Sequence, residues 1–195
     1  MGARQNQEED SLRILVIRPG AIGDALLTFP ILQALRNKYP QCHITFVSNV
    51  SVLPLARVLG LAEETFDFQD WQWAELFLIP GIEHKGIEGG SANGGAQESS
   101  PQKRLQHIDL AICWLRIFED ITKQNLLAGG VREVIVAPGH PRESERIHIV
   151  EYLAKTIGLQ DEYVVLLNLP DVMAISNAAG LSRPDLRDYI AIHPG

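Results

Sequence analysis

The sequence predicts an α/β fold built around a parallel β-sheet. Three observations predict it: residues 12–18 form a short apolar run rich in β-branched residues, a Gly-containing turn and a helical pattern follow, and a second such run covers residues 43–48. Two strands joined by a helix within this length form a βαβ unit, whose strands are parallel and whose crossover is right-handed. Further apolar runs alternate with helical patterns, as α/β folds require.

The first helical pattern contains a proline that should interrupt it. Leu27, Ile31 and Leu35 recur at helical spacing, and Pro40 closes the segment. Pro30 would lie inside a helix that starts at residue 24, where it lacks a backbone donor and clashes with the preceding turn. We therefore expect a kink or a restart near Thr28, and a restart would separate residues 24–27 as a first turn.

The remaining elements follow in the same alternation up to a weakly patterned stretch after Trp73. The expected elements are a helix at 52–59, a strand at 64–68, a strand at 108–114, a helix at 121–127 ended by Gly129 and Gly130, a strand at 131–137, a helix at 145–157 and extended segments at 163–167 and 189–193. Residues 81–104 are rich in Gly, Ser and Asn, so they predict a flexible surface insertion.

The composition excludes several classes of function. The 195 residues are 46% hydrophobic and carry a net charge of −7, so the chain can bury a core but has no basic excess for binding nucleic acid. No apolar run approaches the length of a membrane span, and Met1–Asp10 has no signal-peptide pattern. Cys42 and Cys113 are too few for a disulfide framework and lack metal-ligand spacing, which favours a reducing cytoplasm.

The most informative segment is the turn between the first strand and the first helix, residues 18–30. Gly20 and Gly23 do not complete a GxGxxG pattern, and no GK[ST] phosphate loop is present. Asp24 at the helix start would repel a phosphate there. Its carboxylate is either a helix N-cap, which the residues alone favour, or a base that accepts a proton from a substrate hydroxyl. Both roles are compatible, because one oxygen can accept from the backbone while the other faces a ligand.

Other side chains that bear chemistry have weaker signals. Arg18 and Arg116 follow predicted strands, where a guanidinium can hold an acidic sugar or a phosphate, although a solvated surface role is slightly favoured for Arg116. The six histidines show no paired ligand spacing, so no metal site is expected, and His148 is expected to pack or cap a helix. An aromatic cluster precedes the insertion, where core packing is favoured over a sugar platform: Trp71, Trp73 and Phe77.

Residues 14–40 resemble the opening of glycosyltransferase family 9, the lipopolysaccharide heptosyltransferases, whose pattern is a strand, a basic residue and then IGDxxLTxPxLxALRxxxP. Residues 147–159 are similar to a helix of that family, and residues 189–195 are similar to the strand and turn that open its second domain. The matching positions are Arg18, Ile22, Gly23, Asp24, Leu27, Thr28, Pro30, Leu32, Ala34, Leu35, Arg36 and Pro40.

The resemblance implies the N-terminal, acceptor-side domain of a GT-B enzyme with Rossmann-like domains. Residues 11–188 would form that domain, and residues 189–195 would begin a donor-binding domain that the 195 residues lack, so the chain is expected to be part of a longer protein and inactive alone. The implied reaction transfers heptose, with inversion, from ADP-heptose to a lipopolysaccharide core hydroxyl. It needs no metal or other cofactor, and Asp24 is its base.

The resemblance also implies partners and acceptor-binding residues. Arg18, Gly20, Gly23 and Arg116 are expected to bind the acceptor, although the loop from Cys113 to Arg116 departs from the family's D-x-x-G pattern. The implied partners are a nucleotide-sugar donor and a glycolipid or saccharide acceptor, with room for a peripheral contact with the inner membrane surface and no transmembrane segment.

Two alternatives belong to other functional classes. The first is a catalytically silent ligand-binding domain left by truncation or divergence. The second is half of a dinucleotide-binding oxidoreductase, which is disfavoured because the third glycine is absent and the second strand ends at Ser48–Asn49 rather than at an acidic residue.

Overall fold

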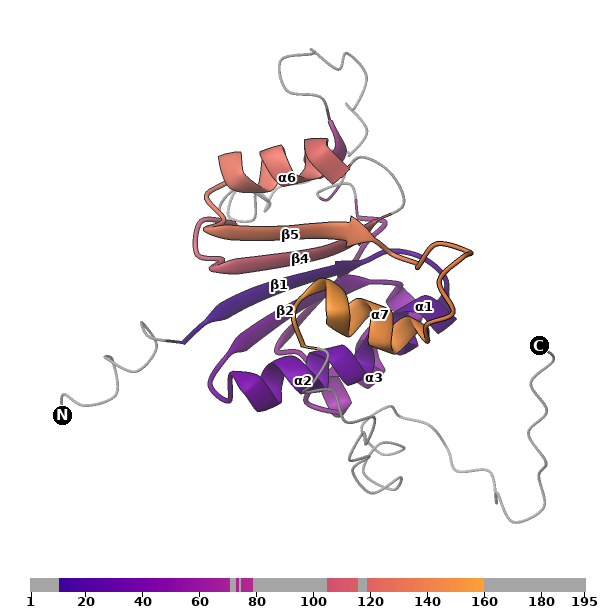
Figure 1. The fold of residues 1–195 in the computed structure, drawn as a ribbon. Coiled ribbons are helices and arrows are strands. Elements are labelled where there is room, and N and C mark those ends of the chain that lie inside the picture. Colours follow the sequence, from indigo (N-terminus) through magenta and orange to yellow (C-terminus); the bar gives the residue numbers. More distant parts are fainter. Residues whose placement is uncertain (1–10, 71–72, 74, 79–104, 116–118, 160–195) are drawn as a thin grey trace.

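The computed structural model describes residues 11–70, 73, 75–78, 105–115 and 119–159. These residues form a five-stranded sheet with helices on both faces (Figure 1). The elements in chain order are β1 (Arg13–Arg18), α1 (Ile22–Leu26), α2 (Phe29–Lys38), β2 (His43–Ser48), η1 (Val50–Val52), α3 (Leu53–Val58), β3 (Glu64–Asp67), η2 (Glu75–Phe77), β4 (Leu110–Leu115), α6 (Glu119–Ala128), β5 (Glu133–Pro138) and α7 (Ile149–Thr156).

All five strands are parallel and lie in the order β3-β2-β1-β4-β5. The central strand β1 pairs with β2 on one side and with β4 on the other, so Ile17 lies between Val47 and Cys113. Along the sequence, β2 and β3 are added on one side of β1, and β4 and β5 are then added on the other side. This Rossmann-like arrangement confirms the predicted fold class, and its switch point, where such folds bind ligands, lies between β1 and β4.

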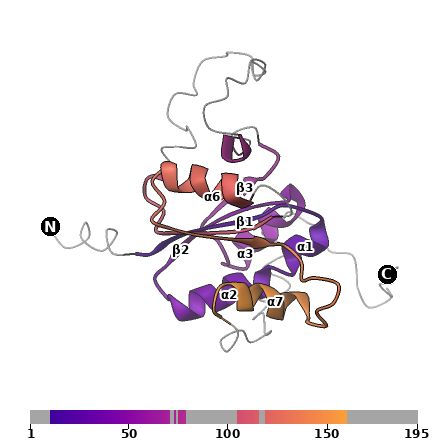
Figure 2. The ribbon, with the colours of Figure 1, turned by 45° about the horizontal axis from the view of Figure 1, so that its top comes forward.

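The sheet separates two apolar layers. The helices α1, α2, α3 and α7 cover one face, and α6 and η2 cover the other (Figures 1 and 2). Because side chains alternate along a strand, β1 contributes Ile14 and Val16 to the first layer and Leu15 and Ile17 to the second. Since β1 is buried on both faces, its run of apolar residues is continuous, as the sequence shows.

The predicted helix restart lies where proline requires it. The first helix ends at Leu26, and α2 begins at Phe29 with Pro30 in its first turn, where the missing N–H is not needed. The hydroxyl of Thr28 donates to the carbonyl oxygen of Asp24 at 3.0 Å across the break. The expectation of a separate first turn is confirmed, although that turn covers residues 22–26 rather than 24–27.

The expected start of the last described helix was wrong by four residues. Residues 145–148 precede α7, and His148 is its N-cap, with Nδ1 accepting from the backbone N–H of Val150 at 3.3 Å. The expected capping role of His148 is confirmed. The expectations for residues 81–104, for Trp71 and Arg116, and for the segments 163–167 and 189–195 lie outside the described residues. Within the described chain, no helix is long and apolar enough to cross a membrane.

Candidate functional site

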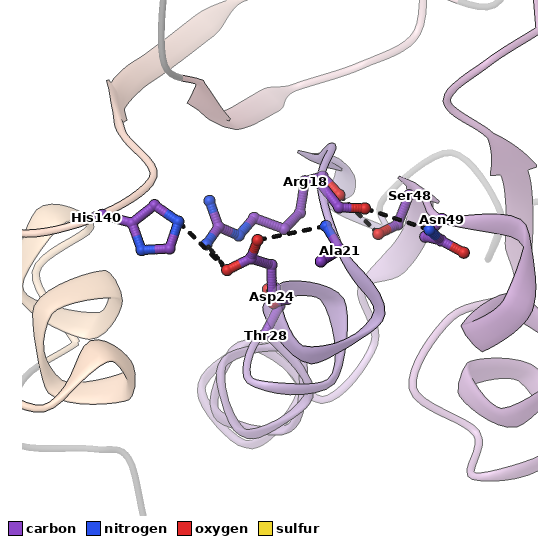
Figure 3. Close-up of polar contacts among 8 residues, drawn as sticks. Arg18, Ala21, Asp24, Thr28, Ser48, Asn49 and His140 are labelled. Atoms are coloured by element: carbon purple, nitrogen blue, oxygen red, sulfur yellow. Dashed lines mark hydrogen bonds and ion pairs between the residues drawn. The ribbon is translucent and has the colours of Figure 1, made fainter. Parts of the chain in front are cut away.

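The turn after β1 is shaped by one glycine and two neighbouring polar side chains. Gly20 has a φ of +131°, and a Cβ there would lie 2.8 Å from Oδ2 of Asp24, so both its conformation and its contact require glycine. From the end of β2, the Ser48 hydroxyl donates to the Arg18 carbonyl at 2.6 Å, and Asn49 Nδ2 donates to the Gly20 carbonyl at 3.2 Å (Figure 3). These contacts hold the turn at the carboxyl edge of the sheet.

Asp24 holds its carboxylate between the turn and the loop that follows β5. Its Oδ2 accepts from the backbone N–H of Ala21 at 3.3 Å, and its Oδ1 lies 3.2 Å from Arg18 Nη2 and 3.3 Å from His140 Nε2 (Figure 3). The interpretation of Asp24 as an N-cap is corrected, because α1 starts earlier, with Ala21 as its N-cap. Asp24 is instead the third helical residue, and its side chain reaches back to the first turn. One oxygen accepts from the backbone, as expected, whereas the other contacts Arg18 and His140.

Arg18 is buried beside this carboxylate. The residue is only 2% exposed, and this burial lowers the pKa of its guanidinium, while the charge of Asp24 opposes that shift. Gly139 allows this packing, because a Cβ there would lie 2.0 Å from Nη1 of Arg18. Arg18 therefore acts first on Asp24, because its buried Nη2 donates to the carboxylate at 3.2 Å.

Sequence reasoning missed His140, which contacts the same oxygen of Asp24. It lies two residues after β5 and is half-exposed, with 52% of its side chain accessible. Nothing in its local sequence marks it out. Its position just after a strand could have indicated that it belongs to the site, because the carboxyl ends of parallel strands lie at the same edge of the sheet.

These groups line a cleft of about 610 Å³ together with apolar and aromatic residues. Its lining consists of Arg18, Pro19, Gly20, Ala21, Asp24, Phe68, Phe77, Trp114, Leu115 and His140. The rings of Phe68 and Phe77 pack edge to face with centroids 5.7 Å apart. The indole N–H of Trp114 donates to Thr156 Oγ1 of α7 at 2.9 Å, and Trp114 is buried, with 1% of the residue exposed.

The predicted site residues divide into three groups. Arg18, Gly20 and Asp24 come together at the cleft, whereas Gly23 is exposed on α1 and outside the lining, and Arg116 lies outside the described residues. The expectation of core packing holds for Trp73, which is 4% exposed, while Phe77 packs on the same apolar layer and also reaches the cleft. In the described part of the chain, no three His, Cys, Asp or Glu side chains gather as metal ligands would.

Comparisons with known proteins reveal similarity at the level of solved structures. No family model and no curated protein matches the sequence. A glycosyl transferase family 9 protein from Veillonella parvula DSM 2008 has a TM-score of 0.48 at 13% identity, covering 77% of this chain and 42% of that one. The E. coli ADP-heptose lps heptosyltransferase II has a TM-score of 0.46 at 17% identity, covering 82% and 44%.

A third structure, E. coli heptosyltransferase WaaC with ADP-2-deoxy-2-fluoro heptose, has a TM-score of 0.44 at 15% identity, covering 86% of this chain and 53% of that one. The chain thus spans about half the length of these proteins. Its described part is a Rossmann-like sheet that is structurally similar, at low sequence identity, to family 9 glycosyltransferases and heptosyltransferases.

Proposed function

We propose that the cleft is the acceptor side of a glycosyltransferase site and that Asp24 is its general base. The observation that carries the proposal is the carboxylate of Asp24 at the cleft wall, fixed by Ala21, Arg18 and His140. A base must be ionised and oriented before the substrate arrives. The contacts from Arg18, Ala21 and His140 to its two oxygens orient the carboxylate.

The proposed step moves one proton and one sugar. The acceptor hydroxyl oxygen attacks the anomeric carbon of the donor, and its proton passes to the Asp24 carboxylate. The bond between that carbon and the nucleotide diphosphate breaks, and the diphosphate leaves with the electron pair. Attack opposite the leaving group inverts the anomeric centre. Arg18 and His140 do not touch the reacting atoms in this scheme and act by positioning Asp24.

For the complete protein we propose ADP-heptose as the donor and a hydroxyl of a lipopolysaccharide core as the acceptor. The motif of residues 18–40 supports this assignment by its resemblance to family 9 glycosyltransferases. The donor would bind a second Rossmann-like domain in a longer protein. Holding donor and acceptor together can supply roughly 7–11 kcal/mol of the barrier in ideal cases, so both sides of the cleft are needed for turnover.

Substitution Asp24→Asn in the complete protein tests the proposal. Asn keeps the shape and the acceptor oxygen for Ala21 but cannot accept the hydroxyl proton. We expect turnover at saturating substrate to fall at least about a hundredfold, since general-base assistance is typically worth 10²–10⁴-fold. The apparent acceptor affinity should change much less, because the lost interaction acts mainly in the transition state. The melting temperature should fall, because the substitution leaves the buried guanidinium of Arg18 without its charged partner, so turnover is compared at a temperature where both proteins are folded.

Asp67→Asn is the matched control. The side chain of Asp67 accepts from the backbone N–H of Gln69 at 2.9 Å, outside the cleft lining, so the same chemical change there should leave turnover unaltered. Normal turnover of Asp24→Asn would remove the catalytic role from this residue. A wild-type protein that binds saccharides in the cleft but transfers none would instead support the silent ligand-binding domain.

A further inference from the structure

The backbone carbonyl of Asp24 does not have the partner that a continuous helix would give it. In such a helix the carbonyl would accept from the N–H of Thr28, four residues later. Here that N–H donates to the carbonyl of Ala25 at 3.1 Å, because the chain breaks between α1 and α2. The side-chain hydroxyl of Thr28 takes its place and donates to the Asp24 carbonyl at 3.0 Å (Figure 3).

This use of the Thr28 side chain differs from the usual one at its position. Thr28 is the N-cap of α2, where a threonine hydroxyl commonly accepts from a backbone N–H of the helix that it precedes. Within this described stretch of the chain no such bond is present, and the hydroxyl reaches back to α1 instead. The residue is 0% exposed, so water does not compete with the hydroxyl for the Asp24 carbonyl. The side chain of Thr28 therefore serves the helix that carries Asp24.

The backbone of Thr28 belongs to the core. Its carbonyl accepts from the N–H of Ile31 at 2.9 Å and from that of Leu32 at 3.1 Å, and both of these residues are fully buried in the first apolar layer. One residue therefore joins the main chain of Asp24 to the packed interior. Other contacts fix the tip of the Asp24 side chain, and the Thr28 hydroxyl fixes the main chain from which that side chain extends.

We propose that Thr28 is a positioning residue, whose hydroxyl holds the main chain of Asp24 so that the carboxylate stays aligned with the acceptor hydroxyl. The inference rests on the proposed function, because it concerns the same base. Thr28 is not among the described residues that line the cleft, so it acts through Asp24 and not on the substrate. A displacement of a reacting group by about 1 Å can cost on the order of a hundredfold in rate. The hydrogen bond should therefore affect turnover more than it affects acceptor binding.

Two substitutions of Thr28 separate its hydroxyl from its packing. Thr28→Val keeps the branched shape and removes the hydroxyl, whereas Thr28→Ser keeps the hydroxyl and removes the methyl group. In the complete protein we expect Thr28→Val to lower turnover at saturating substrate roughly five- to fiftyfold, while the apparent acceptor affinity changes less than about twofold. Thr28→Ser should keep turnover within about threefold of the wild type, although the loss of a buried methyl group lowers its melting temperature.

Turnover is compared at a temperature where every variant is folded. If Thr28→Val does not fold, Thr28→Ala replaces it as the variant without a hydroxyl. It is then compared with Thr28→Ser, from which it differs by the hydroxyl alone, and we expect the same fall in turnover.

Thr122 of α6 offers a matched control. It is also 0% exposed, and its hydroxyl has no hydrogen-bond partner among the described residues. Helix α6 covers the other face of the sheet from α1 (Figure 2). Thr122→Val therefore makes the same chemical change in an equally buried place away from Asp24, and it should leave turnover unaltered.

A double-mutant cycle tests whether Thr28 acts through Asp24. In an Asp24→Asn background the base is already absent, so adding Thr28→Val should lower turnover by less than about twofold. If Thr28→Val caused its full loss in that background as well, the positioning role would be overturned. Turnover of Thr28→Ser as low as that of Thr28→Val would overturn it too, because the effect would then come from packing.

The same measurements distinguish this inference from the proposed function. Normal turnover of Asp24→Asn alone would reject the base, and the inference with it. A large loss in Asp24→Asn together with wild-type turnover in Thr28→Val would keep the base and reject the inference.

Discussion

At the scale of single residues, the absence of a side chain at Gly139 allows the ion pair of the site to form. A Cβ at this buried position would lie 2.0 Å from Arg18 Nη1 and 3.2 Å from its Cζ. These atoms are the far end of the Arg18 side chain, and because that side chain is buried it has little room to shift. We expect Gly139→Ala to lower the free energy of unfolding by about 1–3 kcal/mol, as overpacking typically does.

Urea denaturation measures this loss, and Gly23→Ala is the control. A Cβ at Gly23 would meet nothing within 4 Å, and the residue lies in α1, where alanine is favoured over glycine by about 1 kcal/mol. The two substitutions should therefore shift stability in opposite directions. If Gly139→Ala were as stable as the wild type, the close packing of Arg18 against this loop would be contradicted.

His140 is expected to affect turnover without affecting stability. Its contact with Asp24 is half-exposed, and such pairs contribute about 0–1 kcal/mol. Removing it by His140→Ala leaves Asp24 with its contacts to Arg18 and Ala21. In the complete protein we expect a turnover loss smaller than that of Asp24→Asn and an unchanged melting temperature. Steady-state kinetics and thermal denaturation measure the two effects, and a loss equal to that of Asp24→Asn would give His140 a direct part in proton transfer.

Sequence reasoning reached the residues of the site that belong to one local motif. Arg18, Gly20 and Asp24 fall within seven consecutive residues, so strand, turn and helix patterns place them together. His140 and Phe68 come from strands far from β1 in sequence, and their positions depend on the strand order. That order is a tertiary property, which local patterns do not determine.

At the scale of secondary-structure elements, the strands and the break between α1 and α2 could be predicted because buried periodicity and proline chemistry act locally. The start of α7 could not. Residues 145–148 continue a helical pattern, but the chain turns at Arg142–Glu145, where the backbone N–H of Glu145 donates to the Arg142 carbonyl at 2.8 Å. The side chain of His148 then caps the helix.

The connection between α2, β2 and β3 contains a carboxylate whose protonation should affect stability. Burial alone would raise the pKa of Glu63, but hydrogen bonds from Arg36 and from the backbone N–H of Ile44 hold it below its ordinary value of 4.5. A lowered pKa means that the stabilisation is present at neutral pH and is lost as the pH falls through the folded-state value.

Glu63→Gln should therefore be less stable than the wild type at pH 7, and this difference should shrink as the pH falls below 4.5. Because the side chain of Glu63 is more than a third exposed, the difference is expected to be small. Urea denaturation of both proteins across this pH range measures it. A difference that stays constant with pH would show that the carboxylate contributes through shape rather than charge.

At the scale of the whole molecule, the two apolar layers share the central strand. Ile14 and Val16 of β1 belong to one layer and Leu15 and Ile17 to the other. Loss of β1 from the sheet would therefore remove core residues from both layers at once.

We expect the two layers to unfold together. Trp114 reports on the layer with α7 and Trp73 on the layer with η2. In a Trp71→Phe background, Trp73→Phe leaves Trp114 as the fluorescent reporter, and Trp114→Phe leaves Trp73. In each variant the urea transition measured by fluorescence should coincide with the transition measured by far-ultraviolet circular dichroism. Fluorescence transitions at separate midpoints from circular dichroism would contradict a shared core.

The break between α1 and α2 has a consequence for motion on slow timescales. Helix α1 buries only Ala25, whereas α2 buries six residues, so the two helices are anchored very unequally although they are neighbours in the chain. A segment with few buried contacts can open locally at a free energy far below that of global unfolding. The amides of α1 should therefore exchange with solvent deuterium sooner than those of α2. Transient opening of α1 would release the carboxylate of Asp24 from the backbone N–H of Ala21 while the sheet and α2 remain folded.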